Sequence, residues 1–181
     1  MVKSPRGVKR VVLGVCGSIA AYKAGDIIRR LQEKGRDVTV VMTAEAKQFI
    51  TPLTLSVLSG KEVYGGMFDA DGWRMGHIEL SRRTDVLVIA PATANIIAKI
   101  AHGFADDLLS ALAMTVRAPI LLAPAMNDDM YANAIVQENC DQLKKHGVRF
   151  IEPVKGKLAC GSEGVGHLAD VDDIVDAVLK A

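Results

Sequence analysis

Short runs of β-branched and aliphatic residues alternate with stretches of helical periodicity along almost the whole chain, which limits the possible folds more than any other feature. Strand character occupies residues 10–15, 38–42, 86–90, 120–123 and 148–151. Because strands that alternate with helices build a parallel sheet with helices on both faces, the sequence predicts a doubly wound α/β fold. We expect a single domain over residues 1–181, with residues 1–8 as a loose N-terminal segment.

The predicted helices differ in how their apolar side chains are distributed. The helix that ends at Gly35 has one apolar and one charged face, whereas residues 107–116 are apolar nearly all round. Such a helix must be covered on two sides, and the sheet of so small a domain covers only one. We infer that another subunit covers the other side; the alternative is a central helix in the monomer core. The other predicted helices occupy residues 44–49, 52–58, 94–101, 128–145 and 171–179.

The charge balance argues against two classes of partner. The 181 residues include 22 Lys and Arg and 21 Asp and Glu, for a formal net charge of +1. Such a chain has no strong field to attract nucleic acid or an anionic membrane surface. The longest apolar stretch, residues 108–126, contains Arg117, Pro119 and Pro124, which indicate a helix, a turn and a strand rather than a membrane span.

The three cysteines, Cys16, Cys140 and Cys160, are scattered and form no CxxC pair. An odd number without paired spacing argues against a disulfide framework and against a structural zinc site, and we expect no metal. The N-terminus is basic but leads into a short apolar run without a small-residue cleavage site, so it does not resemble a secretory signal. A reducing, cytosolic setting fits these features best.

Ligands of an open α/β sheet bind beyond the carboxyl ends of the strands, so the residues that follow each strand are the candidate site. The first strand leads into Gly17-Ser18 and a helix, whose free N–H groups favour a phosphate. This segment is not GxGxxG, and the second strand ends at Thr43 without an acidic residue for a dinucleotide ribose, which argues against NAD. A mononucleotide phosphate is compatible with it; equally, Gly17 and Ser18 form only a turn and a helix N-cap.

Small residues also follow the third and fourth predicted strands. The small side chains of Pro91-Ala92-Thr93-Ala94-Asn95 would let a flat ring approach the backbone closely. The next strand is followed by Pro124-Ala125-Met126-Asn127. Thr93 and Asn127 are also well placed as helix N-caps, which is the commoner role for such residues.

His77 and Cys160 are further candidates for chemistry. His77 stands at the end of a glycine-flanked loop, just before a strand-like segment, and a lone histidine is more often structural than catalytic. Cys160 lies within residues 156–166, where four glycines predict a mobile loop between the last strand and the last helix. A thiol on such a loop can close over a ligand and exchange a proton, which makes Cys160 a better candidate than Cys16 or Cys140.

Five motifs occur in order along the chain: Gly17-Ser18-Ile19-Ala20-Ala21-Tyr22-Lys23, His77-Ile78-Glu79-Leu80, Pro91-Ala92-Thr93-Ala94-Asn95, Pro124-Ala125-Met126-Asn127 and Leu158-Ala159-Cys160-Gly161. Together they resemble the flavin-containing cysteine decarboxylases. The resemblance covers residues 9–179, and five ordered motifs are far more specific than any one of them.

The resemblance implies a Rossmann-like flavoprotein fold that binds FMN, assembled as a homotrimer or a trimer-based higher oligomer with the flavin between subunits. Gly17 and Ser18 would face the FMN phosphate, and Ala125 and Met126 would border the flavin. The other residues that the resemblance places around the flavin are Thr43, Phe49, Ala92, Thr93, Ala94 and Asn95.

The resemblance also implies a reaction, the FMN-dependent decarboxylation of 4′-phosphopantothenoylcysteine to 4′-phosphopantetheine in coenzyme A biosynthesis. Direct loss of CO2 from a cysteine carboxylate would leave an unstabilised carbanion, and the implied route avoids it through a thioaldehyde and an enethiol, with FMN as electron carrier. In that route His77 would be the base and Cys160 the final proton donor. Asn127 would hold the substrate carboxylate, and Ala159 would contact the substrate.

Four other functions compete with this one: a decarboxylase of peptide C-terminal cysteines, a flavin prenyltransferase, a non-catalytic regulatory flavoprotein and an NAD-type dehydrogenase. The combination of His77, Asn127 and Cys160 favours a decarboxylase, although peptide decarboxylases share much of the site.

The sequence departs from the family pattern at two positions. Tyr131 stands where family members commonly have tryptophan, and His167 stands where many bacterial members carry arginine. Bacterial relatives of the family are often fused to a ligase that joins phosphopantothenate to cysteine. Because 181 residues leave no room for that domain, we expect either a stand-alone enzyme or a domain excised from a longer protein.

Overall fold

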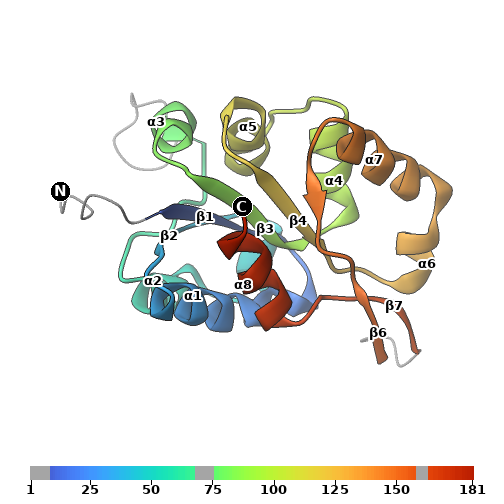
Figure 1. Ribbon diagram of the computed structural model, residues 1–181, viewed down its shortest axis with the longest axis horizontal. Coiled ribbons are helices and arrows are strands. Elements are labelled where there is room, and N and C mark those ends of the chain that lie inside the picture. The colour runs from blue at the N-terminus through green and yellow to red at the C-terminus, as the bar shows by residue number, and fades with distance from the viewer. Residues whose placement is uncertain (1–8, 68–75, 158–162) are drawn as a thin grey trace.

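Five parallel strands form the central sheet of the computed structural model, which describes residues 9–67, 76–157 and 163–181 (Figure 1). The strands are β1 (Arg10–Val15), β2 (Asp37–Met42), β3 (Val86–Ala92), β4 (Ile120–Pro124) and β5 (Arg149–Phe150). They lie in the order β2-β1-β3-β4-β5, and all neighbouring pairs are parallel. The doubly wound parallel sheet predicted from the sequence is therefore confirmed.

Helices cover both faces of this sheet (Figure 1). One face carries α1 (Ala24–Glu33), α2 (Pro52–Ser59) and α8 (Val171–Leu179), and the other carries α3 (Gly76–Arg82), α4 (Ala94–Ala101), α5 (Leu108–Thr115) and α7 (Ala134–Lys145). Alternate residues of β1 supply both layers, since Val11 and Leu13 belong to one core cluster and Val12 belongs to the other. Within the described ranges, no helix combines the length and the hydropathy that crossing a bilayer requires.

The predicted helix over residues 128–145 is divided into α6 (Asp128–Ala132) and α7. Asn133 lies between them with φ −60° and ψ 131°, and its side chain accepts a hydrogen bond from the Ile135 N–H at 3.0 Å. A side chain that bonds to nearby backbone in this way competes with the helix and starts a new one. Two 3-10 helices, η1 (Ile19–Lys23) and η2 (Glu45–Gln48), follow β1 and β2.

The segment that begins at His77 is a helix rather than the predicted strand-like segment. Residues 76–82 form α3, and an ion pair of 2.7 Å between Glu79 and Arg83 joins side chains one helical turn apart. Leu80 packs against the core cluster that contains α4 and α5. Of the short run Ile78 to Leu80, only Leu80 packs against this core cluster. One helical turn can bury a single residue as well as a strand can, so the pattern does not distinguish the two.

The glycine-rich stretch 156–166 begins and ends in a β-hairpin rather than in a free loop. β6 (Val154–Lys157) pairs antiparallel with β7 (Glu163–His167), and Gly156 lies opposite Gly164. Glycine residues can take part in this pairing because the hydrogen bonds between the strands join backbone N–H and C=O groups and need no side chains. Residues 158–162, between β6 and β7 in the sequence, lie outside the described residues, and the predicted loose segment 1–8 does so as well.

The apolar helix α5 is covered within the chain. Residues Leu108 to Ala113 are buried, because α3 and α4 pack on either side of α5 and the sheet lies beneath it. Only the end of the helix is open, where Met114 is 49% exposed. The inference that another subunit must cover this helix is therefore wrong, and the alternative of a central helix in the monomer core is confirmed.

Arg10 and Asp85 join the starts of the two central strands. The Arg10 N–H donates to Asp85 Oδ2 at 2.7 Å, and the guanidinium donates to both carboxylate oxygens at 3.0 and 3.1 Å. The hydrogen bond from Arg10 is the main reason why the pKa of the Asp85 carboxyl lies below its usual value.

We expect Asp85→Asn to lower the free energy of unfolding at pH 7 by at most about 1 kcal/mol, because both side chains are partly exposed and screened by solvent. The pKa of Asp85 is lower in the folded state, so its contribution is complete above the unfolded value of about 3.9 and is lost as the pH falls through the folded value. Urea unfolding of both proteins between pH 7 and pH 2 measures this. A difference that grows as the pH falls would contradict it.

Candidate functional site

A cavity of about 760 Å³ opens at the carboxyl edge of the sheet, within the usual size range of ligand pockets. Its walls come from the segments that follow β1, β2, β3 and β4, together with residues at the end of β7. The chain leaves β1 toward β2 and leaves β3 toward β4, so these neighbouring strands connect in opposite directions. A crevice at this point is the usual ligand site of a doubly wound sheet.

The cavity gathers almost all the residues that the sequence predicts around a cofactor. The lining includes Gly17, Ser18, Thr43, Phe49, Thr93, Ala94, Asn95, Ala125, Met126 and also Asn127. Ala92 is the exception, because its side chain is fully buried in β3. Its carbonyl oxygen accepts a hydrogen bond from the Ala125 N–H at 3.0 Å, so Ala92 ties the ends of β3 and β4 together beneath the cavity.

Three of the polar residues that the sequence predicts around the cofactor or substrate are also helix caps. Ser18 accepts from the Ala20 N–H at 3.4 Å, Thr93 from the Ile96 N–H at 3.4 Å and Asn127 from the Met130 N–H at 3.2 Å. The capping role weighed for Ser18, Thr93 and Asn127 in the sequence is therefore confirmed. It does not remove them from the cavity, because each cap stands at the strand end where the helix begins.

Gly17 is a position where any side chain would collide with the opposite wall. A Cβ atom at Gly17 would lie 2.4 Å from the Cβ atom of Glu45 on η2. The close approach of these two segments depends on the missing side chain.

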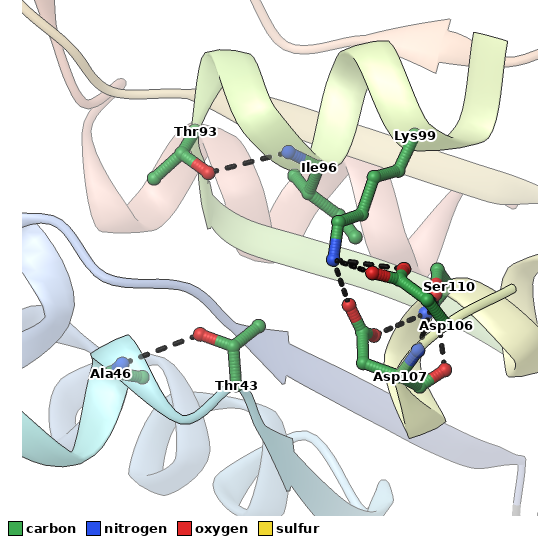
Figure 2. A network of polar contacts seen from close by, with 8 residues as sticks. All are labelled: Thr43, Ala46, Thr93, Ile96, Lys99, Asp106, Asp107 and Ser110. Atoms are coloured by element: carbon green, nitrogen blue, oxygen red, sulfur yellow. Dashed lines mark hydrogen bonds and ion pairs between the residues drawn. The ribbon is translucent and has the colours of Figure 1, made fainter. Parts of the chain in front are cut away.

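A network of polar contacts joins α4 to α5 at one wall of the cavity (Figure 2). Asp107 caps α5, since its Oδ1 accepts from the Ser110 N–H at 2.8 Å, and its Oδ2 accepts from Lys99 Nζ at 2.7 Å. Lys99 also pairs with Asp106 at 2.9 Å. Burial alone would raise the pKa of the Asp107 carboxyl, but the hydrogen bonds from Lys99 and Ser110 lower it overall. Asp107 is therefore an ionised cavity residue.

Sequence reasoning missed several lining residues, because some lie on helices and others lie at the end of β7, which was not predicted as a strand. Ile19 and Tyr22 are both 59% exposed although their side chains are large and apolar. The sequence alone does not show this exposure, because it does not show which face of η1 is buried. His167 lines the cavity from the end of β7, whereas Tyr131 does not and instead donates to Glu152 at 2.6 Å. The other lining residues without a sequence prediction are Ala20, Lys23, Glu45, Ile96, Asp107, Met130, Gly166 and Leu168.

His77 does not line the cavity of its own chain. Because α3 returns the chain to the start of β3, the first turn of α3 lies at the same edge of the sheet as the cavity. α5 stands between α3 and α4 (Figure 1), and this wall of the cavity is formed by the start of α4 together with Asp107 at the start of α5. Cys160 and Ala159 lie outside the described residues, so their predicted roles have no geometry here.

The other two cysteines are buried free thiols. Complete burial raises the pKa of Cys16 to about 12, and burial also raises the pKa of Cys140. The thiolate is the reactive form of cysteine, so neither residue is a nucleophile at neutral pH.

We expect Gly17→Ala to lower the free energy of unfolding by about 2 kcal/mol, because the added methyl group forces η2 away from the wall of the cavity. Gly60→Ala is the matched control: nothing lies within 4 Å of its Cβ position, and only the positive φ of 69° opposes it, which costs about 1 kcal/mol. Urea unfolding of both variants measures the difference. A smaller loss at Gly17 than at Gly60 would contradict the tight contact.

The sequence matches the flavoprotein family over residues 2–181. It is 47% identical over 173 residues to a probable phosphopantothenoylcysteine decarboxylase of Streptococcus mutans, an alignment that covers 94% of this chain and 97% of that protein. It is 45% identical over 168 residues to the coenzyme A biosynthesis bifunctional protein CoaBC of Vibrio vulnificus, where the alignment covers 92% of this chain. The chain spans only 42% of the length of that bifunctional relative.

Solved structures share the fold over nearly the whole chain. A PPC decarboxylase mutant complexed with pantothenoylaminoethenethiol superposes with a TM-score of 0.84 at 32% identity, over 96% of this chain and 97% of that one. The FMN-dependent cysteine decarboxylase SpaF superposes with a TM-score of 0.83 at 35% identity, over 95% of this chain and 96% of that one. By sequence and by fold, the chain belongs to the flavoprotein family.

Proposed function

We propose that this protein catalyses the FMN-dependent decarboxylation of 4′-phosphopantothenoylcysteine to 4′-phosphopantetheine. The observation that carries the proposal is the cavity at the point between β1 and β3, which brings the predicted cofactor residues and Asn127 together. The streptococcal relative has the corresponding name, and it matches this chain over 97% of its own length. The reaction would belong to coenzyme A biosynthesis, the process named for the bifunctional relatives.

The residues of the cavity suit a flavin mononucleotide. The Ser18 hydroxyl lines the cavity at the start of η1 and can donate a hydrogen bond to a phosphate. Ala94 and Ala125 leave room for a flat ring against the backbone, and Met126 offers an apolar contact. When bound, FMN supplies a two-electron acceptor that returns the electrons at the end of the reaction.

Three residues would act on the substrate in this proposal. The Asn127 amide would hold the carboxylate that leaves as CO2, and it already stands in the cavity wall at the start of α6. His77 would take the thiol proton of the substrate, and Cys160 would return a proton at the end, with Ala159 beside the substrate. The support for the role of Cys160 is its place in the sequence between β6 and β7, since β7 ends with Gly166 and His167 in the cavity lining.

We also propose that the protein works as a homo-oligomer, a trimer or a larger assembly of trimers, with the flavin between subunits. The support is the position of His77, which α5 separates from the cavity of its own chain. A neighbouring copy could receive His77 at its cavity mouth, where Ile19, Tyr22 and Met130 leave large apolar side chains exposed. The expectation of an oligomer therefore rests on this proposed contact and no longer on the apolar helix α5.

The partner and setting complete the proposal. A ligase that joins phosphopantothenate to cysteine would supply the substrate, either as a separate protein or fused to this domain as in the bifunctional relatives. The buried free thiols of Cys16 and Cys140 suit the reducing, cytosolic setting expected from the sequence.

Two substitutions separate the first half of the proposed reaction, the loss of CO2, from the second half, the return of a proton to the product. In Cys160→Ser the hydroxyl is a much poorer acid than the thiol, so we expect CO2 loss followed by accumulation of an enethiol product instead of 4′-phosphopantetheine. In His77→Asn we expect no CO2 loss, because the thiol proton has no acceptor. Mass measurement after incubation of the FMN-loaded protein with phosphopantothenoylcysteine detects both outcomes. Formation of 4′-phosphopantetheine by Cys160→Ser at the wild-type rate would show that Cys160 is not the donor.

The same measurement with a cysteine-terminated peptide tests the rival substrate, and FAD and NAD in place of FMN test the cofactor. Decarboxylation of the peptide alone, or tight binding of NAD without FMN, would overturn the proposed function.

The proposed site between subunits predicts complementation. We expect His77→Asn and Asn127→Ala to be inactive alone, since each removes one residue from every site. When the two variants are refolded together in equal amounts, about one quarter of the sites receive both intact residues if His77 acts in a neighbouring subunit. Recovered activity near that fraction, with light scattering for the assembly size, supports the proposal. A mixture that stays inactive, or a wild-type monomer with bound flavin, would contradict it.

A further inference from the structure

Two acidic residues, Glu45 and Asp107, line a cavity whose proposed ligands are anions. FMN and the proposed substrate each carry a phosphate monoester, and the substrate also carries a carboxylate. Carboxylates beside such ligands repel them unless their own charge is cancelled or screened. The surroundings of each acidic residue therefore decide whether it opposes binding.

Glu45 and Asp107 differ in their contact with water. Glu45 is exposed on η2, so solvent and salt screen its charge. Asp107 is half-buried at the start of α5, with 31% of its side chain exposed. A charge at such a depth is screened less, and Asp107 needs a counter-ion close by.

Lys99 provides that counter-ion without lining the cavity itself (Figure 2). Its ammonium lies 2.7 Å from Asp107 Oδ2, and only 21% of the lysine side chain is exposed. Burial alone would lower the pKa of Lys99, but the hydrogen bonds to Asp107 and Asp106 raise it overall, so Lys99 stays charged. Asp106 is 59% exposed and does not line the cavity. The short contact to Asp107 is thus the one that alters the field in the cavity.

We propose that Lys99 cancels the charge of Asp107 and thereby allows the cavity to hold a ligand that carries a phosphate monoester. Lys99 acts through Asp107 and is a positioning residue, because it does not contact the space that the ligand would fill. The inference rests on the proposed function for the identity of the ligands. It explains why a site for anions can keep an aspartate: Asp107 caps α5 through Oδ1, and Lys99 neutralises it through Oδ2.

The first arm of the test compares FMN with riboflavin, which lacks the phosphate. We expect Lys99→Met to weaken FMN binding by about tenfold while riboflavin binding changes less than about threefold, because an uncompensated carboxylate repels the dianion. Asp107→Asn in the same chain removes that carboxylate, and the double variant should bind FMN within about threefold of the wild type. Lys99→Arg keeps the charge and should bind FMN like the wild type. Fluorescence titration of the apoprotein gives these dissociation constants.

The second arm asks whether the substrate phosphate is the affected group. With FMN at saturation, KM is measured for phosphopantothenoylcysteine and for pantothenoylcysteine, which lacks the phosphate. A rise confined to the phosphorylated substrate in Lys99→Met, and reversed in the double variant, assigns the effect to the substrate phosphate. A loss confined to FMN in the first arm assigns it to the cofactor.

Lys61→Met is the matched control, since Lys61 forms an ion pair of similar burial with Asp37 and does not line the cavity. We expect it to change neither arm. Equal losses for ligands with and without phosphate, or a double variant no better than Lys99→Met, would overturn the inference and leave Lys99 as a purely structural contact between α4 and α5. Failure of the wild type to bind FMN would instead overturn the proposed function, so the two failures are distinguishable.

Discussion

The hydrogen-bonded pairing of β1 with β3 determines where everything else in the candidate site can lie. These strands are neighbours in the sheet although β2 comes between them in the chain, with Val11 opposite Val86 and Gly14 opposite Ile89. Because the chain leaves them in opposite directions, η1 and α4 begin side by side and then diverge. The cavity fills the space between them, so its position follows from strand order before any side chain is considered.

This dependence explains why the cofactor residues were predictable and the charged network was not. Gly17, Thr93 and Asn127 each follow a strand, and periodicity locates strand ends from local sequence alone. Ala92 is the exception among the predicted cofactor residues because β3 extends as far as Ala92, so the side chain of Ala92 is buried in the sheet and only the residues after it line the cavity. Asp107 follows a helix, and its place in the cavity wall depends on how α5 packs on the sheet, which local sequence does not specify.

The two larger errors have a common origin. Residues after His77 resemble a strand as easily as a helix, because so few of them are apolar. Without α3, nothing in the chain remains to cover the second side of α5, and a second subunit becomes the natural inference. Once residues 76–82 are a helix, α3 packs on α5 and that reason disappears. The expectation of an oligomer then depends on His77, which α3 holds apart from its own cavity.

Helix capping prepares this site before a ligand arrives. Ser18, Thr93, Asn127 and Asp107 each use a side-chain oxygen to accept a backbone N–H of the helix that they begin, so folding restricts their rotamers. A ligand therefore meets polar groups whose conformational entropy is already lost, which reduces the cost of ordering them on binding. The cap also determines what such a residue can offer. A capping carboxylate is ionised and brings a negative charge, whereas a capping hydroxyl or amide is neutral, and only Asp107 among the four needs a lysine to neutralise it.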